Sequence, residues 1–225
     1  MKLDVIAIDG PAGAGKSTVA KLVAERLNFI YVDTGAMYRA VTSVVLEKGI
    51  SPSDSVALDH LAENVSVRLE DSATGLKVFA DGTDVTVRIR SKEVTRYVST
   101  VSRNSSVRKA MVRLQCQMAS SGKAVLDGRD IGTVVVTDAA TKIFLIADIA
   151  ERVRRRQNEL AEAGRQVDFE QLRAEMIFRD EEDGAREISP LVPAKDAVFV
   201  DTTGMSIPEV VEKIISIRKE KLHAI

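Results

Sequence analysis

Residues 3–27, LDVIAIDGPAGAGKSTVAKLVAERL, contain an apolar run, a glycine-rich segment and an amphipathic segment, in that order. The run LDVIAID predicts a short strand buried on both faces of a parallel sheet. The glycine-rich segment 10–17 matches G-x-x-x-x-G-K-[ST] at every fixed position, and apolar residues recur at helical spacing in 19–27. A strand before this motif and a helix after it form the context that a phosphate-binding loop requires. The stretch therefore predicts a P-loop fold.

The loop predicts a nucleoside triphosphate as ligand. Glycines let the backbone curve so that its N–H groups converge on phosphate oxygens, with a helix N-terminus behind them. Lys16 is expected to reach the β- and γ-phosphates, and the Ser17 hydroxyl to ligate Mg²⁺. The predicted ATP-binding residues are Gly10, Pro11, Ala12, Gly13, Ala14, Gly15, Lys16, Ser17 and Thr18. The alternatives are a glycine-rich turn that carries a lysine by chance, and a dinucleotide site, whose G-x-G-x-x-G spacing does not fit.

The alternation of strands and helices continues through most of the chain. Further apolar strands are predicted at 29–33, 124–127, 142–148 and 197–201, and the last leads into a helix whose start carries Ser206 and Glu209 at capping-box spacing. Five buried strands separated by helices predict an α/β fold with a five-stranded parallel sheet of the P-loop NTPase type, flanked by helices.

Two segments depart from this alternation. Within 63–90, three runs with period-2 patterning (VSVRLE, LKVFA and DVTVRI) are separated by the turn sequences DSATG and DGTD, which predicts a small antiparallel β meander inserted into the domain. Helices are expected near 91–121. The charged stretch 148–191 is predicted to be helical, either as solvated helix faces laced with ion pairs or as a mobile basic lid over phosphates. Composition alone favours the first reading.

Composition fits one globular domain with insertions. The chain has 225 residues, 45% hydrophobic and 29% charged, with a net charge of -1, so no basic field favours nucleic acid or an anionic membrane. Its one cysteine, Cys116, is expected in the core, and two histidines make a catalytic triad or histidine metal site improbable. The N-terminal apolar run is too short for a signal peptide or membrane span, so we expect a cytoplasmic protein.

The phosphate loop leaves several classes of protein open. A GTPase would need the guanine-reading motif N-K-x-D, but no asparagine in the chain is followed by lysine. A transporter or helicase ATPase would be larger or accompanied by further modules. Small-molecule kinases remain as the main class, with an ATP-gated binding protein as the non-enzymatic alternative.

The segment DTGAMYR, residues 33–39, lies at the predicted end of a strand, where open α/β sheets bind ligands. Asp33 ends the strand, and Tyr38 and Arg39 are expected on the first turn of the helix that follows. An aromatic ring beside an arginine could stack on a base or sugar while the guanidinium grips a phosphate. Tyr38 could equally be a half-buried packing residue.

The segment LDGRDIGTVV, residues 126–135, follows another predicted strand. Asp127 is expected at the same edge of the sheet, where its carboxylate would lie near Mg²⁺. Arg129 and Asp130 would lie in the next loop, over the acceptor. The alternative for DGRD is a tight turn with a local Asp–Arg pair.

Taken together, these motifs resemble those of bacterial-type cytidylate kinases over essentially the full length of the chain. The matching segments are IDGPAGAGKST, DTGAMYR, VSTVSRNSSVR, DGRDIGTVV, KIFLIA, RDEEDGAREISPLVPA and DTTGMSIPEVV. Adenylate and shikimate kinases share the phosphate loop but would not be expected to carry the DGRD…GTVV segment or this insert. The resemblance implies a single P-loop kinase domain, 1–225, in which 63–90 belongs to the monophosphate-binding part and 148–191 forms the lid.

The resemblance also implies transfer of phosphate from ATP, with Mg²⁺, to CMP or dCMP, and a site for each part of the reaction. Lys16, Arg129 and Arg186 would be catalytic, and Arg156 would contact ATP. The substrate-binding set would be Asp33, Tyr38, Arg39, Ser99, Arg108, Arg129, Asp130, Arg179, Asp183 and Arg186. Ser99, Arg108 and Asp130 would line the cytosine, whose 4-amino group donates a hydrogen bond that an aspartate can accept. We expect a monomer with nucleotides as its only partners.

Spacing gives independent support to the lid. Arg179, Asp183 and Arg186 are spaced i, i+4 and i+7, which is one helix face unless Gly184 interrupts the helix and marks a hinge. The arginines 152, 155 and 156 are likewise at i, i+3 and i+4. Together with the resemblance, this spacing makes the lid the favoured interpretation of 148–191.

An acceptor phosphate is already ionised at neutral pH and needs no general base, which fits the scarcity of histidine. The nearest alternative is a kinase of UMP, AMP or a hydroxylated metabolite. A non-catalytic ATP-dependent regulator is the alternative from another class. Nucleic-acid binding is disfavoured, because acids accompany the arginines and aromatic residues make up only 4%.

Overall fold

The computed structural model describes residues 2–72, 75–162 and 164–223 and divides into two compact units. Unit 1 comprises Met1–Tyr31 and Ser121–Ile225, and unit 2 comprises Val32–Ser120. Each unit contains its own sheet and helices, and we describe each separately.

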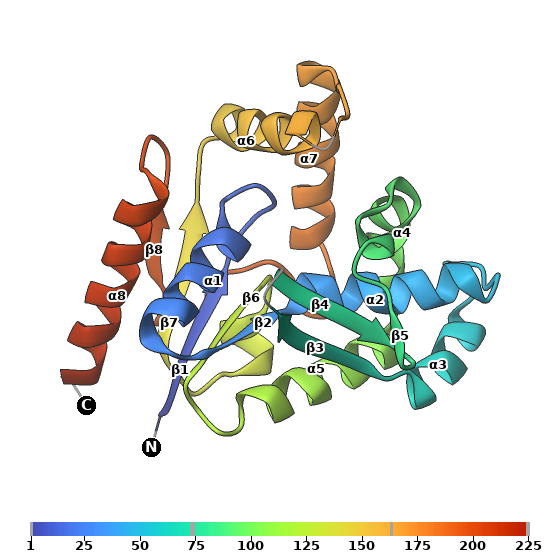
Figure 1. The fold of residues 1–225 in the computed structure, drawn as a ribbon, viewed down its shortest axis with the longest axis horizontal. Helices are drawn as coiled ribbons and strands as arrows, with labels where there is room; N and C mark the ends of the chain where they lie inside the picture. The colour runs from blue at the N-terminus through green and yellow to red at the C-terminus, as the bar shows by residue number, and fades with distance from the viewer. Residues whose placement is uncertain (1, 73–74, 163, 224–225) are drawn as a thin grey trace. The chain divides into compact units, whose positions relative to one another are not determined.

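A five-stranded sheet is the centre of unit 1, in the order β2-β6-β1-β7-β8 (Figure 1). Its strands are β1 (Leu3–Asp9), β2 (Ile30–Asp33, whose last two residues belong to unit 2), β6 (Ala124–Gly128), β7 (Ala139–Ile146) and β8 (Val198–Asp201). Parallel pairing joins β1 to β6 and β7, and β7 to β8. Val5 to Ile8 of β1 are fully buried, as expected for the middle strand of a sheet covered on both faces. The predicted five-stranded parallel sheet is confirmed.

Among the described residues of unit 1, four helices and one short turn accompany the sheet. Helix α1 (Lys16–Leu27) packs on β6 and on α8 (Ile207–His223), and α8 also contacts β7. The start of α8 carries the predicted capping pair, since the N–H and hydroxyl of Ser206 both donate to Glu209, at 2.8 and 2.7 Å. A π-helical turn (Ile131–Val135) follows β6. Helices α6 (Ile149–Glu162) and α7 (Phe169–Gly184) pair around a small core of Val153, Leu160, Leu172 and Met176.

Unit 2 is built around α2 (Thr34–Glu47), which contacts α4 (Lys92–Arg103), α5 (Ser105–Ala119) and the antiparallel sheet. That sheet consists of β3 (Val67–Ser72), β4 (Gly75–Ala80) and β5 (Thr83–Asp84) in sequential order. Helix α3 (Ser55–Asn64) packs on α5. The predicted antiparallel β meander and the two helices near 91–121 are therefore present.

The prediction of a third strand over DVTVRI, residues 84–89, is wrong for most of that segment. Only Thr83 and Asp84 pair with β4, and the chain then forms a 3₁₀ turn at Arg88–Arg90. Side chains provide the reason. Asp84 accepts from the N–H of Thr86, and the hydroxyl of Thr86 accepts from the N–H of Val78, so side-chain oxygens take the place of the sheet ladder.

Two further expectations are corrected, and one alternative that the sequence left open is settled. Cys116 is exposed, because α5 buries the stripe Val107, Met111, Gln115 and Ala119 at i, i+4 spacing and Cys116 lies one residue off it. Since α2 begins at Thr34, Tyr38 and Arg39 lie on its second turn instead of its first. Helix α7 ends at Gly184, so Arg186 lies beyond the helix that carries Arg179 and Asp183.

Across the described ranges 2–72, 75–162 and 164–223, no helix has the length and apolar character needed to cross a membrane.

Candidate active site

The loop between β1 and α1 has a conformation that requires glycine at two positions. Gly10 has φ of 149°, and a Cβ atom there would lie 2.1 Å from the carbonyl oxygen of Leu145 on β7. Gly15 has φ of 87°, in the left-handed region, and is the N-cap of α1. The backbone therefore turns back on itself directly before a helix N-terminus, as a phosphate-binding loop must.

Lys16 folds over this loop. Its Nζ donates to the carbonyl oxygen of Pro11 at 2.8 Å, and the residue is 6% exposed. The pKa of Lys16 is lowered to about 7, mainly by burial and next by the nearby charge of Arg129, while Asp127 opposes both. A polyphosphate beside Nζ would favour the charged ammonium and raise the pKa of Lys16. An anion bound here would therefore form an ion pair with Lys16.

Asp127, at the end of β6, binds two hydroxyl groups. Ser17 donates to its Oδ2 at 2.7 Å and Tyr31 donates to its Oδ1 at 3.0 Å, and the carboxylate is buried. A hydroxyl and a carboxylate suit Mg²⁺, which prefers oxygen ligands and usually keeps waters and substrate phosphates as its other ligands. The described residues contain no group of three or more His, Cys, Asp and Glu side chains arranged to hold a metal. Tyr31 was not predicted, and its only signal was a polar aromatic on a buried strand.

A buried carboxylate joins two of the predicted arginines. Asp183 of α7, 1% exposed, accepts from Nε of Arg129 at 2.8 Å through Oδ2 and from Arg186 through Oδ1. Burial alone would raise the pKa of Asp183, but the guanidiniums of Arg129 and Arg186 outweigh it and hold this pKa below its usual value. Both guanidiniums are thus fixed by one ionised group. The alternative interpretation of DGRD, a tight turn with a local Asp–Arg pair, does not hold for Arg129, because its ion-pair partner lies 54 residues away.

Arg179 adds a further positive charge to the same region. It lies on α7, one turn before Asp183, and its charge lowers the pKa of both Lys16 and Asp183. Asp130 is buried, and its carbonyl accepts from Val134 and Val135 at the start of the π-helical turn. The structure therefore brings the predicted residues of unit 1 from the phosphate loop, the end of β6 and α7 into one charged cluster.

Helices α6 and α7 contact the phosphate loop directly through an ion pair. Arg152 donates to the carbonyl oxygen of Ala12 at 3.1 Å and pairs with Asp180, whose Oδ1 accepts from the N–H of Ala12 at 3.4 Å. Beside it, a Cβ at Gly13 would lie 3.0 Å from the carbonyl oxygen of Arg152 and 2.9 Å from Met176. The helical pair is packed onto the loop. Asp180 was not predicted, and Arg152 was noted only for its spacing.

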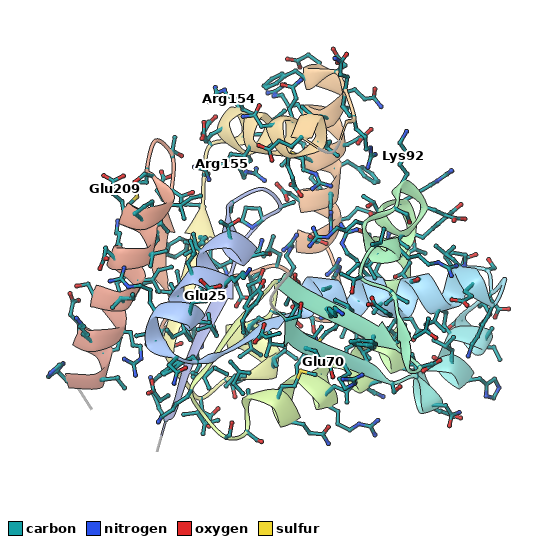
Figure 2. All side chains as sticks on the ribbon, viewed as in Figure 1. Glu25, Glu70, Lys92, Arg154, Arg155 and Glu209 are labelled. Atoms are coloured by element: carbon teal, nitrogen blue, oxygen red, sulfur yellow. The ribbon has the colours of Figure 1, made fainter. Side chains whose placement is uncertain are left out.

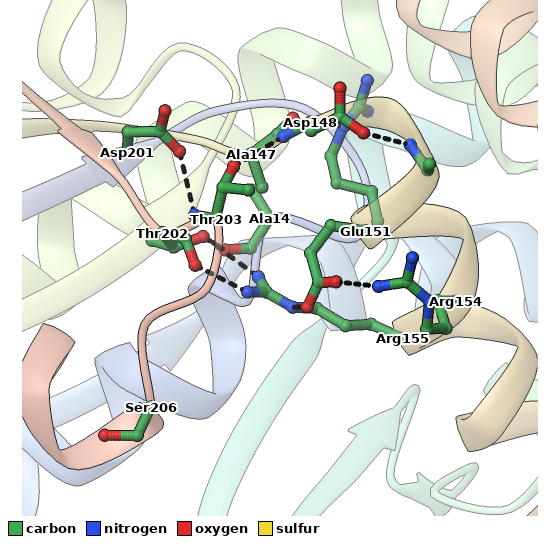
Figure 3. A network of polar contacts seen from close by, with 12 residues as sticks. Ala14, Ala147, Asp148, Glu151, Arg154, Arg155, Asp201, Thr202, Thr203 and Ser206 are labelled. Atoms are coloured by element: carbon green, nitrogen blue, oxygen red, sulfur yellow. Dashed lines mark hydrogen bonds and ion pairs between the residues drawn. The ribbon is translucent and has the colours of Figure 1, made fainter.

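Arg155 extends this contact to the loop after β8 (Figure 3). It donates to the hydroxyl and carbonyl oxygens of Thr202 at 3.0 and 2.7 Å, and Glu151 accepts from its Nε at 3.0 Å. The Thr202 hydroxyl lies 3.4 Å from the carbonyl oxygen of Ala14. Figure 2 shows Arg155 beside the more exposed Arg154 on α6. Arg156, the predicted ATP contact, pairs with Glu159 at 2.7 Å on its own helix.

In unit 2, Tyr38 and Arg108 lie together. The guanidinium of Arg108 is 5.3 Å from the centre of the Tyr38 ring, and its Nη1 donates to the carbonyl oxygen of Ser102 at 3.1 Å. Arg108 is only 3% exposed. An arginine held against an aromatic face provides a flat polar and apolar surface of the kind that recognises a base.

The remaining predicted residues of unit 2 are more separate. Arg39 donates to the carbonyl oxygen of Ile89 at 3.3 Å and to the hydroxyl of Thr95 at 3.0 Å. Ser99 lies on α4 and its carbonyl accepts from the hydroxyl of Ser102 at 3.1 Å. Asp33 caps α2 by accepting from the N–H of Ala36 at 2.8 Å, so this carboxylate already has a structural role.

Comparisons with known proteins show the family to which this chain belongs. The family model described as cytidylate kinase matches residues 6–220. The cytidylate kinase of Shouchella clausii is 53% identical over 215 residues, covering 96% of each chain. That of Halalkalibacterium halodurans is 48% identical, covering 99% of this chain and 100% of its own. The cytidylate kinase of Bacillus subtilis is 47% identical, covering 96% of each.

A solved structure of an uncharacterized protein from Eubacterium ventriosum is similar in fold, with a TM-score of 0.55 at 13% identity, covering 97% of this chain and 99% of that one. At this identity it supports the fold alone. The family match spans nearly the whole chain, and the relatives exceed 45% identity over nearly their full lengths. The chain therefore belongs to the cytidylate kinase family.

Proposed function

We propose that this protein transfers the γ-phosphate of ATP to CMP or dCMP, giving ADP and CDP or dCDP. The observation that carries the proposal is the cationic cluster of unit 1. Lys16, Arg129, Arg179 and Arg186 gather around a phosphate loop, with one buried carboxylate, Asp183, to hold two of them. Phosphoryl transfer requires this concentration of positive charge, because the transferring group spreads negative charge over three oxygens.

In the proposed reaction, the protein positions the reactants and neutralises charge. The acceptor phosphate oxygen is ionised at neutral pH, so no side chain has to remove a proton. Lys16 would contact the β- and γ-phosphates, and the planar guanidiniums of Arg129 and Arg186 would each pair with two oxygens. Ser17 and Asp127 would hold Mg²⁺, which neutralises phosphate charge when bound. Lys16, Arg129 and Arg186 are therefore the proposed catalytic residues.

We assign the acceptor base to Ser99, Arg108 and Asp130, and the nucleoside and ribose to Tyr38, Arg179 and Asp183. An aspartate can accept from the 4-amino group of cytosine, whereas uracil presents an oxygen at that position and would be repelled. Arg39, with Arg129 and Arg186, would bind the acceptor phosphate. The buried position of Asp130 supports this role, because repulsion between its carboxylate and the oxygen of uracil is weakly screened in a buried site.

The whole chain would act as one P-loop kinase domain, with 63–90 as part of the monophosphate-binding segment and 148–191 as a lid. The packing of α6 and α7 on Ala12 and Gly13 supports the lid, because it places this segment against the loop that would hold the triphosphate. Closure of a lid would exclude water and suppress ATP hydrolysis. We further propose a cytoplasmic monomer that binds nucleotides and neither nucleic acid nor membrane.

The experiment measures ADP release with ATP and Mg²⁺ and, in turn, CMP, dCMP, UMP, AMP, GMP and shikimate. We expect rapid ADP release with CMP and dCMP. The variant Asp130→Asn should lose its preference for CMP over UMP but keep its affinity for ATP. Faster ADP release with another acceptor than with CMP or dCMP would show that the proposed substrate is wrong. ATP binding without turnover of any acceptor would favour a non-catalytic regulator.

A further inference from the structure

Asp9 is a buried carboxylate that the proposed reaction does not use. It is the last residue of β1, immediately before the phosphate loop, and only 3% of its surface is exposed. The pKa of Asp9 is raised to about 6, chiefly by burial, although two backbone hydrogen bonds oppose the shift. Of the neighbouring charges, Asp130 contributes to the rise and Lys16 opposes it. A carboxylate kept at such a cost needs a structural or functional reason.

The two oxygens of Asp9 bind two successive backbone amides. Oδ1 accepts from the N–H of Ile131 and Oδ2 from the N–H of Gly132, each at 2.8 Å. These amides begin the π-helical turn Ile131–Val135, and amides at the start of a helical turn have no partner within the turn. Asp9 supplies that partner from another strand, 122 residues away.

The backbone of Asp9 anchors the other end of the same segment. In the pairing of β1 with β6, Asp9 lies opposite Gly128. Asp9 therefore holds the chain on both sides of the dipeptide Arg129–Asp130. Before the dipeptide, Asp9 pairs with Gly128 in the sheet, and after it, the Asp9 carboxylate binds the N–H of Ile131. Gly132 has little space beside it, since a Cβ there would lie 3.1 Å from Lys142 Cδ and 3.4 Å from Asp9 Oδ2.

We infer that Asp9 is a positioning residue for phosphoryl transfer, which fixes Arg129 and Asp130 relative to the phosphate loop that begins at Gly10. This inference rests on the proposed function, in which Arg129 binds the acceptor phosphate and Asp130 reads the base. Because the carboxylate binds the acceptor-side turn and not the loop backbone, its loss should impair the use of CMP more than the binding of ATP.

The test is Asp9→Asn, which keeps the size of the side chain. An asparagine offers one acceptor oxygen and turns its NH₂ group toward the other amide, so one of the two hydrogen bonds is lost. We expect kcat/KM for CMP to fall about 10²-fold, the cost of displacing a reacting group by about 1 Å. ATP affinity, measured by titration calorimetry, should stay within about twofold, because the loop itself is intact.

The control is Asp54→Ala, which removes the cap of α3, where Asp54 accepts from Ala57 at 3.0 Å. It should lower the melting temperature without changing kcat/KM. A second variant, Gly132→Ala, disturbs the same turn while keeping the Asp9 carboxylate, and should give a smaller loss in the same parameter. If Asp9→Asn does not fold, Gly132→Ala tests the inference in its place: a fall in kcat/KM for CMP with unchanged ATP affinity would support it, and no fall would overturn it.

Two results would overturn the inference. In one, the folded variant keeps kcat/KM for CMP within about twofold of wild type, which would make Asp9 merely structural. In the other, ATP affinity and CMP turnover fall by the same factor, which would show general loosening of the site. A wild-type protein that turns over no CMP would instead overturn the proposed function, and would be seen before any variant is compared.

Discussion

The phosphate loop and the Tyr38–Arg108 pair are two regions proposed to bind nucleotides, and they are assembled in different ways. The loop takes its ligand-binding groups from eight consecutive residues, 10–17, between one strand and one helix. Tyr38 and Arg108 come from α2 and α5, seventy positions apart along the sequence (108 − 38), and meet only because those helices pack together. A contiguous site is determined by local conformation, whereas a site shared among helices depends on the packing of its whole unit.

The largest effect should come from the loop itself. Lys16→Ala removes the ammonium proposed to contact the transferring phosphate, and kcat for ADP release with CMP should fall about 10³-fold. The control is Lys21→Ala on the same helix, whose side chain is 48% exposed and pairs only weakly with Glu25, and it should leave kcat unchanged. Near-wild-type turnover of Lys16→Ala would remove Lys16 from the mechanism.

Arg108→Met should impair the use of CMP without affecting ATP binding, and so distinguish the Tyr38–Arg108 pair from the phosphate loop. The substitution keeps much of the buried stem but removes the guanidinium that lies against Tyr38, so kcat/KM for CMP should fall about 10²-fold while ATP affinity is kept. Arg113→Met, at an exposed position of the same helix, is the control. Equal losses for ATP and CMP would mean that Arg108 acts through the fold of its unit and not on the acceptor.

A smaller effect should distinguish the neighbouring arginines of α6. Arg155 reaches Thr202, beside Ala14 of the loop, whereas Arg156 pairs with Glu159. Arg155→Ala should therefore raise KM for ATP about tenfold, the cost of losing charge-assisted hydrogen bonds, and Arg156→Ala should raise it less. Arg154→Ala, which removes an exposed side chain, is the control. The reverse order would restore Arg156 as the ATP contact.

The smallest change should appear in acid, as a difference in stability. The pKa of Asp183 is held below its ordinary value of 3.8, so the unfolded chain takes up its proton at a higher pH than the native protein does. The stability contributed by its ion pairs is thus present above about pH 4 and is lost as pH falls through the lower native pKa.

Urea unfolding of wild type and Asp183→Asn at several pH values measures this contribution. The gap between the two unfolding free energies should be constant from about pH 7 to pH 5 and narrow below about pH 4. A gap that widens in acid would contradict the assignment of Asp183 as the ionised partner of Arg129 and Arg186.

Much of the fold was readable from the sequence because its signals are local. The five strands of the main sheet are short apolar runs, and Ser206 with Glu209 marks the start of α8. The third strand of the meander was predicted wrongly, because period-2 patterning in 84–89 does not reveal that Asp84 and Thr86 bond to nearby backbone amides. Cys116 was misplaced because the buried face of α5 is set by its neighbours, and one residue turns a helix by about 100°.

The sequence by itself determined the phosphate loop, because the glycines, Lys16 and Ser17 are adjacent and their conformations are fixed by local sterics. It also supplied the arginines and aspartates of the proposed site, but not how they pair. Only the tertiary structure shows that Asp183 lies between Arg129 and Arg186. It also shows that Arg155, and not Arg156, contacts Thr202, and that Asp9 binds the turn after β6. These interactions link residues far apart in the chain, so they exist only once the sheet register and helix packing are formed.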